Sequence, residues 1–254
     1  MIYPGLVSIT FRQLTPAAVI ELVAQTDLRG IEWGGDVHVP HGDVATAQRV
    51  RQQTLDAGLV VAAYGSYYRA SHEESGPFEA VLESAVALGA PTIRVWAGRQ
   101  GTESADEAYW QAVIEDSRRI ADLAAASKVT IAYEFHNKTL TDTNSAARRL
   151  LERVNHPNIR SYWQPPRYSA VDENLAGIDA VAPWLSHIHV FQWHRVSGER
   201  EALAVGAADW QQYFSRIHQI EGDRYAMLEF VENDDKAAFI RDARTLQTWL
   251  AALV

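Results

Sequence analysis

Three short apolar runs of this chain contain side chains that can hold a metal ion. They are Glu134 in TIAYEFH (130–136), His189 in LSHIHVFQW (185–193) and Glu229 in YAMLEFV (225–231). Because side chains alternate between the two faces of a strand, each group lies opposite the face that carries the larger apolar residues. Two carboxylates and an imidazole, without thiolates, suit a hard or borderline divalent cation. The spacing therefore predicts a metal site if the three runs are strands that end at one place.

The same alternation places further polar groups on the inward faces of strands. They are Glu32, Arg94, Trp96, His136 and His187. For any one of them, an ion pair at the rim of the fold is the structural alternative. The three inward groups Glu134, His189 and Glu229 come from three separate core strands, and this combination favours a functional site.

Strand and helix patterns alternate along the whole chain. The apolar runs are 6–10, 30–34, 59–64, 92–96, 130–135, 159–163, 185–191 and 225–231. They show almost no polar alternation, which is typical of strands covered on both faces. Eight such units without a linker predict a single (β/α)8 TIM barrel over residues 1–254, with its chemistry at the carboxyl ends of the strands. An open doubly wound sheet is the alternative, but ITFRQLTPAAV lacks the glycine-rich fingerprint of its nucleotide-binding form.

Local signals mark where the helices begin and end. Helices are predicted to begin at Thr15, which Pro16 follows, and at Asp43. Two helices are predicted to end just before Gly58 and Gly89. The longest helix is expected at 105–126 and the last one at 234–253. The sixth unit predicts only a short helix.

Composition limits the partners of this chain. Its 23 basic and 32 acidic residues give a net charge of -9, which opposes binding to nucleic acids and acidic membranes. The absence of cysteine excludes disulfides, zinc thiolate sites and a cysteine nucleophile. The N-terminal segment MIYPGLVSIT lacks a signal-peptide pattern, and no window approaches about 18 apolar residues. A cytoplasmic location is expected.

The order and spacing of these motifs resemble the sugar phosphate isomerase/epimerase family. These xylose isomerase-like TIM barrels include ketose 3-epimerases and hydroxypyruvate isomerases. The resemblance runs from LVSITF and GIEWGGDVH to the closing LEFV. In that family a Glu, an Asp, a His and a Glu on the fifth to eighth strands hold one metal. It therefore implies that Glu134, His189 and Glu229 are metal ligands, with Mn²⁺ as the expected ion and Mg²⁺, Co²⁺ or Zn²⁺ as alternatives.

The run SYWQPPRY (161–168) departs from the family pattern. Gln164 takes the place of the metal-binding Asp, and Arg167 takes the place of a substrate-binding His. Gln164 can offer a carbonyl oxygen to the metal but brings no charge, so we expect weaker metal binding. Arg167 adds a cation that can grip a carboxylate or phosphate through two parallel hydrogen bonds. An ion pair of Arg167 with Asp172 or Glu173 is the structural alternative.

The resemblance also implies a substrate-binding role for Arg195, in HIHVFQWHR. The other candidates for binding a small carbohydrate substrate are His136, His187, Arg94 and Trp96. The exposed aromatic residue Trp193, in the loop after the seventh strand, suggests a homodimer in which the partner covers the barrel mouth.

The implied activity is isomerisation or epimerisation of a sugar, sugar phosphate or keto-sugar. Glu134 or Glu229 would remove a proton next to the carbonyl, and the cation would stabilise the enediolate. One alternative is a metal-dependent lyase that eliminates from an oxidised sugar or glycoside. Another is a non-catalytic sugar-binding barrel. A phosphodiesterase resembling endonuclease IV would need more inward His and Asp ligands and a basic face.

Overall fold

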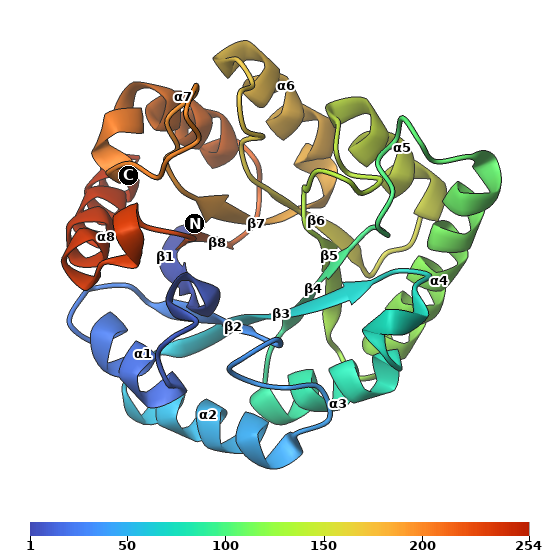
Figure 1. Ribbon diagram of the computed structural model, residues 1–254, viewed down its shortest axis with the longest axis horizontal. Helices are drawn as coiled ribbons and strands as arrows, with labels where there is room; N and C mark the ends of the chain where they lie inside the picture. The colour runs from blue at the N-terminus through green and yellow to red at the C-terminus, as the bar shows by residue number, and fades with distance from the viewer. Residues whose placement is uncertain (254) are drawn as a thin grey trace.

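The computed structural model describes residues 1–253, in which eight parallel strands close into one barrel (Figure 1). The strands are β1 (Ile2–Val7), β2 (Gly30–Gly34), β3 (Val60–Arg69), β4 (Thr92–Trp96), β5 (Thr130–Tyr133), β6 (Ile159–Trp163), β7 (Leu185–Val190) and β8 (Arg224–Leu228). They are paired in chain order, and β1 pairs with both β2 and β8, so the sheet has no free edge. The predicted (β/α)8 TIM barrel is confirmed.

The helices form a ring outside the barrel (Figure 1). They are α1 (Pro16–Val23), α2 (Val44–Asp56), α3 (Phe78–Leu88), α4 (Glu107–Ala126), α5 (Asn144–Val154), α6 (Val171–Val181), α7 (Ala207–His218) and α8 (Lys236–Ala251). The hydroxyl of Thr15 caps α1 by accepting from Ala18 N at 3.3 Å, and the Asp43 carboxylate caps α2 by accepting from Thr46 N at 2.9 Å. Gly89 ends α3 in the left-handed conformation, with φ +73°. The predicted caps at these three positions are confirmed.

The first strand begins and ends earlier than the predicted range 6–10. Residues Ser8–Phe11 form a 3₁₀ turn in its place. The hydroxyl of Ser8 accepts from Gly34 N at 2.9 Å, and the hydroxyl of Thr10 accepts from Phe230 N at 3.1 Å. These two bonds attach the turn to the end of β2 and to the residues that follow β8.

The fifth and eighth strands are shorter than the apolar runs that predicted them. β5 stops at Tyr133 and β8 at Leu228, so Glu134 and Glu229 directly follow the last strand residues. Both residues still donate a backbone hydrogen bond to the neighbouring strand, from Glu134 N to Val95 O and from Glu229 N to Val190 O. The strand alternation therefore still governs where their side chains point.

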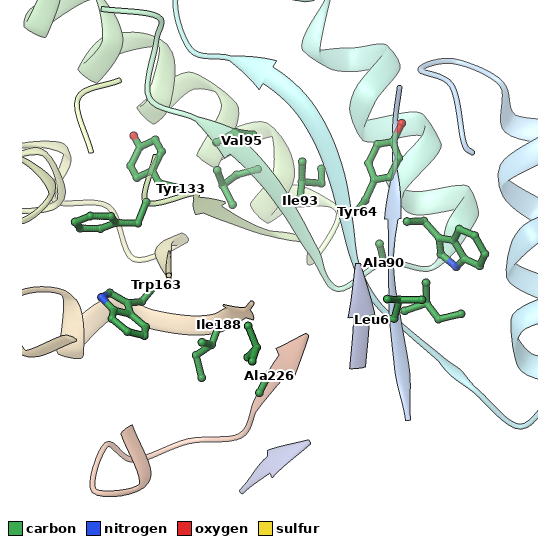
Figure 2. Close-up of a cluster of buried hydrophobic side chains, with 14 of the residues drawn as sticks. Leu6, Tyr64, Ala90, Ile93, Val95, Tyr133, Trp163, Ile188 and Ala226 are labelled. Atoms are coloured by element: carbon green, nitrogen blue, oxygen red, sulfur yellow. The ribbon is translucent and has the colours of Figure 1, made fainter. Parts of the chain in front are cut away.

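Two apolar layers lie on the two sides of the barrel wall. Figure 2 shows side chains of the layer between strands and helices, among them Tyr64, Val95, Tyr133, Trp163 and Ile188. The layer inside the barrel consists of Val7, Ile9, Ala62, Ala63, Ala132, Tyr162 and Met227. Several of these inner residues are small, which leaves space for larger polar groups near the carboxyl ends of the strands. None of the described helices combines the length and apolarity that crossing a membrane requires.

Candidate metal centre

Glu134, His189 and Glu229 come together at the carboxyl end of the barrel. Each offers one ligand atom, and these atoms all lie within 4.8 Å of one another. All three side chains are buried, and His189 Nδ1 lies 3.3 Å from Glu229 Oε2. The chain thus positions two carboxylates and one imidazole from the ends of β5, β7 and β8 around one point. This is the convergence that the strand alternation predicts.

The buried charges around this point do not balance without a cation. Glu32 is fully buried and accepts from Arg94 Nε at 2.7 Å, while Arg94 NH1 donates to Glu134. With a neutral His189, the three carboxylates of Glu32, Glu134 and Glu229 against the single guanidinium of Arg94 leave a net charge of -2, and a proton on His189 reduces it to -1. Because an uncompensated buried charge is costly, a divalent cation fits this cluster.

The pKa shifts report the same deficit of positive charge. Burial alone would lower the pKa of His189, but the charges of Glu229 and Glu32 outweigh it and raise that pKa to about 10. Burial alone would raise the pKa of Glu134, and the charge of Arg94 turns the shift downward. Glu134 therefore stays ionised, and His189 takes up a proton when no other cation is near. A metal ion would replace that proton.

Gln164 lies between two members of the cluster. Its Nε2 donates to Phe135 O at 2.8 Å and to Glu134 Oε1 at 3.2 Å, and its Oε1 lies 3.0 Å from His189 Nδ1. The two acceptors fix which end of the amide carries the nitrogen. The carbonyl oxygen consequently faces the ring nitrogen of His189 that also faces Glu229. Gln164 is placed where it can supply a fourth, uncharged ligand.

A cavity of about 740 Å³ opens above this cluster. Glu134, Gln164 and Glu229 form part of its lining, together with Arg12, Tyr67, Trp96, His136, Arg167 and Phe230. Tyr67, Tyr168 and Phe230 all line it with left-handed backbones, at φ 59°, 70° and 60°. Such a conformation costs a non-glycine residue roughly 1–3 kcal/mol and concentrates at functional sites. The strained backbones of these aromatic residues support a functional role for this cavity.

His136 lies on the wall of the cavity with a defined ring tautomer. Its ring stacks on Trp96, with centroids 4.8 Å apart and planes inclined by 28°. Its Nδ1 lies 2.7 Å from Asn137 O, and because a carbonyl can only accept, Nδ1 carries the proton. In the neutral ring the lone pair is therefore on Nε2. The indole of Trp96 also donates to Glu134, so one residue supports both the His136 ring and a candidate ligand.

Arg167 presents a cation to the same cavity. Its guanidinium carbon lies 3.8 Å from the ring centroid of Trp193, and no ion pair of Arg167 occurs within residues 1–253. The alternative pairing with Asp172 or Glu173 is therefore absent from the described part of the chain. A guanidinium stacked on an aromatic ring keeps its N–H edge available for an anion.

The sequence reasoning missed Arg12 as a cavity residue. Arg12 donates to Asp36 at 2.9 Å and to the Tyr67 hydroxyl at 2.7 Å, and it lines the cavity beside Ile9. It follows the 3₁₀ turn that replaces the end of the predicted first strand. Its position immediately after that run was the available signal, because loops after barrel strands form the active-site face.

Three predicted substrate-binding residues either lie outside the main cavity or are bonded to other residues. His187 is outside the cavity lining, deeper in the barrel, where its Nδ1 accepts from Tyr225 N at 3.1 Å and burial lowers its pKa to about 4. Arg195 pairs with Asp209 at 2.6 Å and lines a smaller adjoining cavity of about 50 Å³. Arg94 does line the main cavity, but two of its nitrogens are taken by carboxylates. Alternation along a strand predicts which side of the barrel wall a side chain faces, but it does not predict how deep in the barrel the side chain lies.

Trp193 does not offer the exposed aromatic surface on which the homodimer expectation depended. It is half-buried, with Arg167 stacked on its ring and the Phe230 ring 5.8 Å away. The homodimer stays a prediction without this support.

Comparisons with known proteins agree with the fold. A family model described as xylose isomerase-like TIM barrel matches residues 20–251. A 3-dehydroshikimate dehydratase of Bacillus anthracis is 23% identical over 247 residues, which are 90% of this chain and 81% of that protein. The crystal structure of a probable 3-DHS dehydratase from Bacillus anthracis has a TM-score of 0.80 at 19% identity, covering 97% of this chain and 99% of that chain.

The crystal structure of 3-keto-D-glucoside 4-epimerase from E. coli, in its apo form, has a TM-score of 0.72 at 16% identity, covering 98% of this chain and 99% of that chain. At these identities, the structural likeness shows the fold. The family model extends over nearly the whole barrel and confirms the resemblance drawn from the motifs. This chain therefore belongs to the xylose isomerase-like TIM barrel family.

Proposed function

We propose that this protein is a divalent-metal-dependent lyase that acts on a polyhydroxylated ketone with a carboxylate group. It removes a proton next to the carbonyl and expels a neighbouring hydroxyl group as water. The observation that supports this proposal is the unequal state of the acid–base groups in the cavity. Glu134 accepts hydrogen bonds at both oxygens, whereas Nε2 of His136 has no hydrogen-bond partner among residues 1–253.

Glu134 is a poor candidate for a catalytic base. Arg94 and Trp96 donate to its Oε2, and Gln164 donates to its Oε1. Arg94 also lowers its pKa, so the carboxylate has little tendency to take a proton. We therefore assign Glu134 to metal binding, with His189, Glu229 and the carbonyl oxygen of Gln164.

His136 is the proposed general base. Its Nδ1–H is anchored on Asn137 O and its ring on Trp96, so Nε2 is the basic atom. Nε2 takes the proton from the carbon next to the carbonyl, and the C–H electrons form the enolate. When the enolate collapses, the C–O bond of the neighbouring carbon breaks, the imidazolium returns its proton to the departing oxygen, and water leaves. The new C=C bond balances the loss of H and OH.

A divalent cation held by these ligands would supply an electrophile that stabilises negative charge on the carbonyl oxygen. Arg167 and Arg12 are the proposed anchors for the substrate carboxylate, because both guanidinium groups line the cavity. Trp96 and Tyr67 provide flat faces for a ring-shaped substrate. The name of the relative, 3-dehydroshikimate dehydratase, gives a substrate of this chemical class.

Epimerisation or isomerisation of a keto-sugar is the second candidate. The observation that favours it is Glu229, which contacts His189 through Oε2 and lines the cavity, so that it and His136 could exchange a proton at two positions. Arg195 and His187 have no assigned contact with substrate in either reaction.

The test is incubation of Mn²⁺-loaded protein with 3-dehydroshikimate and, separately, with neutral ketoses in D₂O. Loss of one water from 3-dehydroshikimate makes an aromatic ring, which is followed by ultraviolet absorbance. We expect that His136→Gln lowers this rate by about 10²–10⁴-fold, whereas His218→Gln, on the exposed end of α7, leaves it unchanged. Deuterium incorporation into ketoses without water loss would favour the second candidate. A chelator-resistant or metal-independent rate would contradict both.

A further inference from the structure

We infer that Glu32 is a positioning residue that holds two metal ligands from below, Glu134 through Arg94 and His189 directly. This inference rests on the proposed metal site. Glu32 is on β2, outside the run of strands β5 to β8 that carries the candidate ligands, and it is fully buried. It has no place in the ligand set itself.

The first link runs through Arg94. Glu32 Oε1 accepts from Arg94 Nε at 2.7 Å, and the NH1 nitrogen of the same guanidinium donates to Glu134. A guanidinium is planar, so fixing one edge on Glu32 fixes the direction of the other edge. Glu32 thereby determines where Arg94 holds the Glu134 carboxylate.

The second link is to the imidazole ring of His189. Glu32 Oε2 lies 3.5 Å from His189 Nε2, and within the described residues neither atom has a hydrogen-bond partner. The opposite ring nitrogen, Nδ1, faces Gln164 Oε1 at 3.0 Å and Glu229 Oε2 at 3.3 Å. A carboxylate behind a metal-binding histidine fixes the ring tautomer and orientation. When a metal ion replaces the Nδ1 proton between Gln164 and Glu229, the remaining ring proton lies on Nε2, which faces Glu32.

The backbone leaves room for this link at one specific residue. A Cβ atom on Gly65 of β3 would lie 2.8 Å from Glu32 Oε1 and 2.6 Å from Arg94 NH2. Any side chain there would push the carboxylate and the guanidinium apart. The Glu32 to Arg94 pair thus depends on glycine at the neighbouring strand position, and Gly65→Ala should mimic a change at Glu32.

The first experiment measures the dissociation constant of Mn²⁺ by electron paramagnetic resonance for the wild type and Glu32→Gln. We expect Glu32→Gln to raise it by about 10–100-fold, the usual effect of removing a group behind a metal ligand. Asp242→Asn is the matched control, because Asp242 is also a buried acid but lies on α8, where it bonds to Arg241 and Leu203 N. The control should stay within about twofold of the wild type.

The outcomes separate this inference from the proposed function. If the wild type binds no Mn²⁺, the proposed function fails and the inference fails with it. If the wild type binds Mn²⁺ and Glu32→Gln binds it equally well, only the inference is overturned.

A second measurement uses the unchanged chain, in case Glu32→Gln does not fold. In ¹⁵N-histidine-labelled protein loaded with Zn²⁺, the ring resonances of His189 report which nitrogen carries the proton, and comparison with His189→Gln assigns them. We expect a protected Nε2–H and a metal-bound Nδ1. A metal-bound Nε2 would overturn the inference, since Glu32 could not then accept from that nitrogen.

Discussion

The two halves of the barrel mouth carry different kinds of polar group. Strands β5 to β8 end in the candidate ligands Glu134, Gln164, His189 and Glu229. Strands β2 and β4 contribute Glu32, Arg94 and Trp96, which contact those ligands. The first group of strands, called the ligand half, would bind the metal. The second group, called the supporting half, would hold the ligands in place. A buried charge at a barrel mouth is therefore not by itself a substrate or metal contact.

The largest expected effect is in the ligand half. His189→Gln removes the imidazole that faces Glu229 and Gln164. We expect loss of Mn²⁺ binding and a fall in kcat/KM on the order of 10³-fold, comparable to losing a main electrostatic contribution to the transition state. Isothermal titration and steady-state kinetics measure the two quantities. A variant that kept both would remove the reason for treating β5 to β8 as the ligand half.

The supporting half is tested by Arg94→Met. This change leaves the buried carboxylates of Glu32 and Glu134 without their guanidinium partner. We expect a decrease of about 3–5 kcal/mol in the free energy of unfolding of the metal-free protein, measured in urea. The control Arg216→Met breaks a half-exposed pair with Asp179 and should cost at most about 1 kcal/mol. Equal effects of the two changes would contradict the comparison.

A change at His187 tests a polar side chain that lies deeper in the barrel than the cavity. Its pKa is lowered by burial from 6.5 to about 4, so the folded state favours the neutral ring. The resulting stabilisation is fully present above pH 6.5 and is lost as the pH falls toward 4, because the unfolded chain then binds the additional proton. Acidification should therefore cost the wild type up to about 3 kcal/mol more than His187→Gln. Urea unfolding of both proteins from pH 7 to pH 4.5 measures the difference. Parallel profiles would show that His187 does not contribute.

A smaller effect is expected at Arg167, on the cavity wall. Arg167→Gln keeps hydrogen-bonding groups but removes the charge stacked on Trp193. For a carboxylate substrate we expect KM to rise about 10–100-fold, since a hydrogen bond to a charged group is worth roughly 1.5–3 kcal/mol. Binding of quinate, a ring polyol with a carboxylate, should weaken in the same way, while binding of the neutral ring polyol myo-inositol should not change. Equal losses for both probes would argue against an anion contact.

The smallest effect is expected at Gln164. Gln164→Asp adds a negative charge beside Glu134 and His189. The affinity for Mn²⁺ should rise about tenfold, because ligand charge tunes cation binding. Competition with a chelator measures it, and Gln164→Leu is the matched uncharged variant that cannot coordinate. If Gln164→Leu binds Mn²⁺ as tightly as the wild type, the amide oxygen is not a ligand.

Much of the ligand half was predictable because alternation is a local property. In the run TIAYEFH, Tyr133 and Phe135 pack outside, so Glu134 must point inward. The roles of Arg94 and His187 were not predictable in this way. The first depends on two carboxylates from other strands, and the second depends on how deep in the barrel its position lies.

The fold, the family and the polar side chains at the ends of β5 to β8 could be predicted from the sequence alone. Those features depend on periodicity and order along the chain, which sequence carries directly. The folded chain alone shows that Glu32 contacts Glu134 through Arg94 and His189 directly, that Arg167 is stacked on Trp193 with no ion pair among residues 1–253, and that Arg195 is bound to Asp209. These outcomes depend on which residues of distant segments meet, because the charge state and direction of a polar side chain are set by its partners.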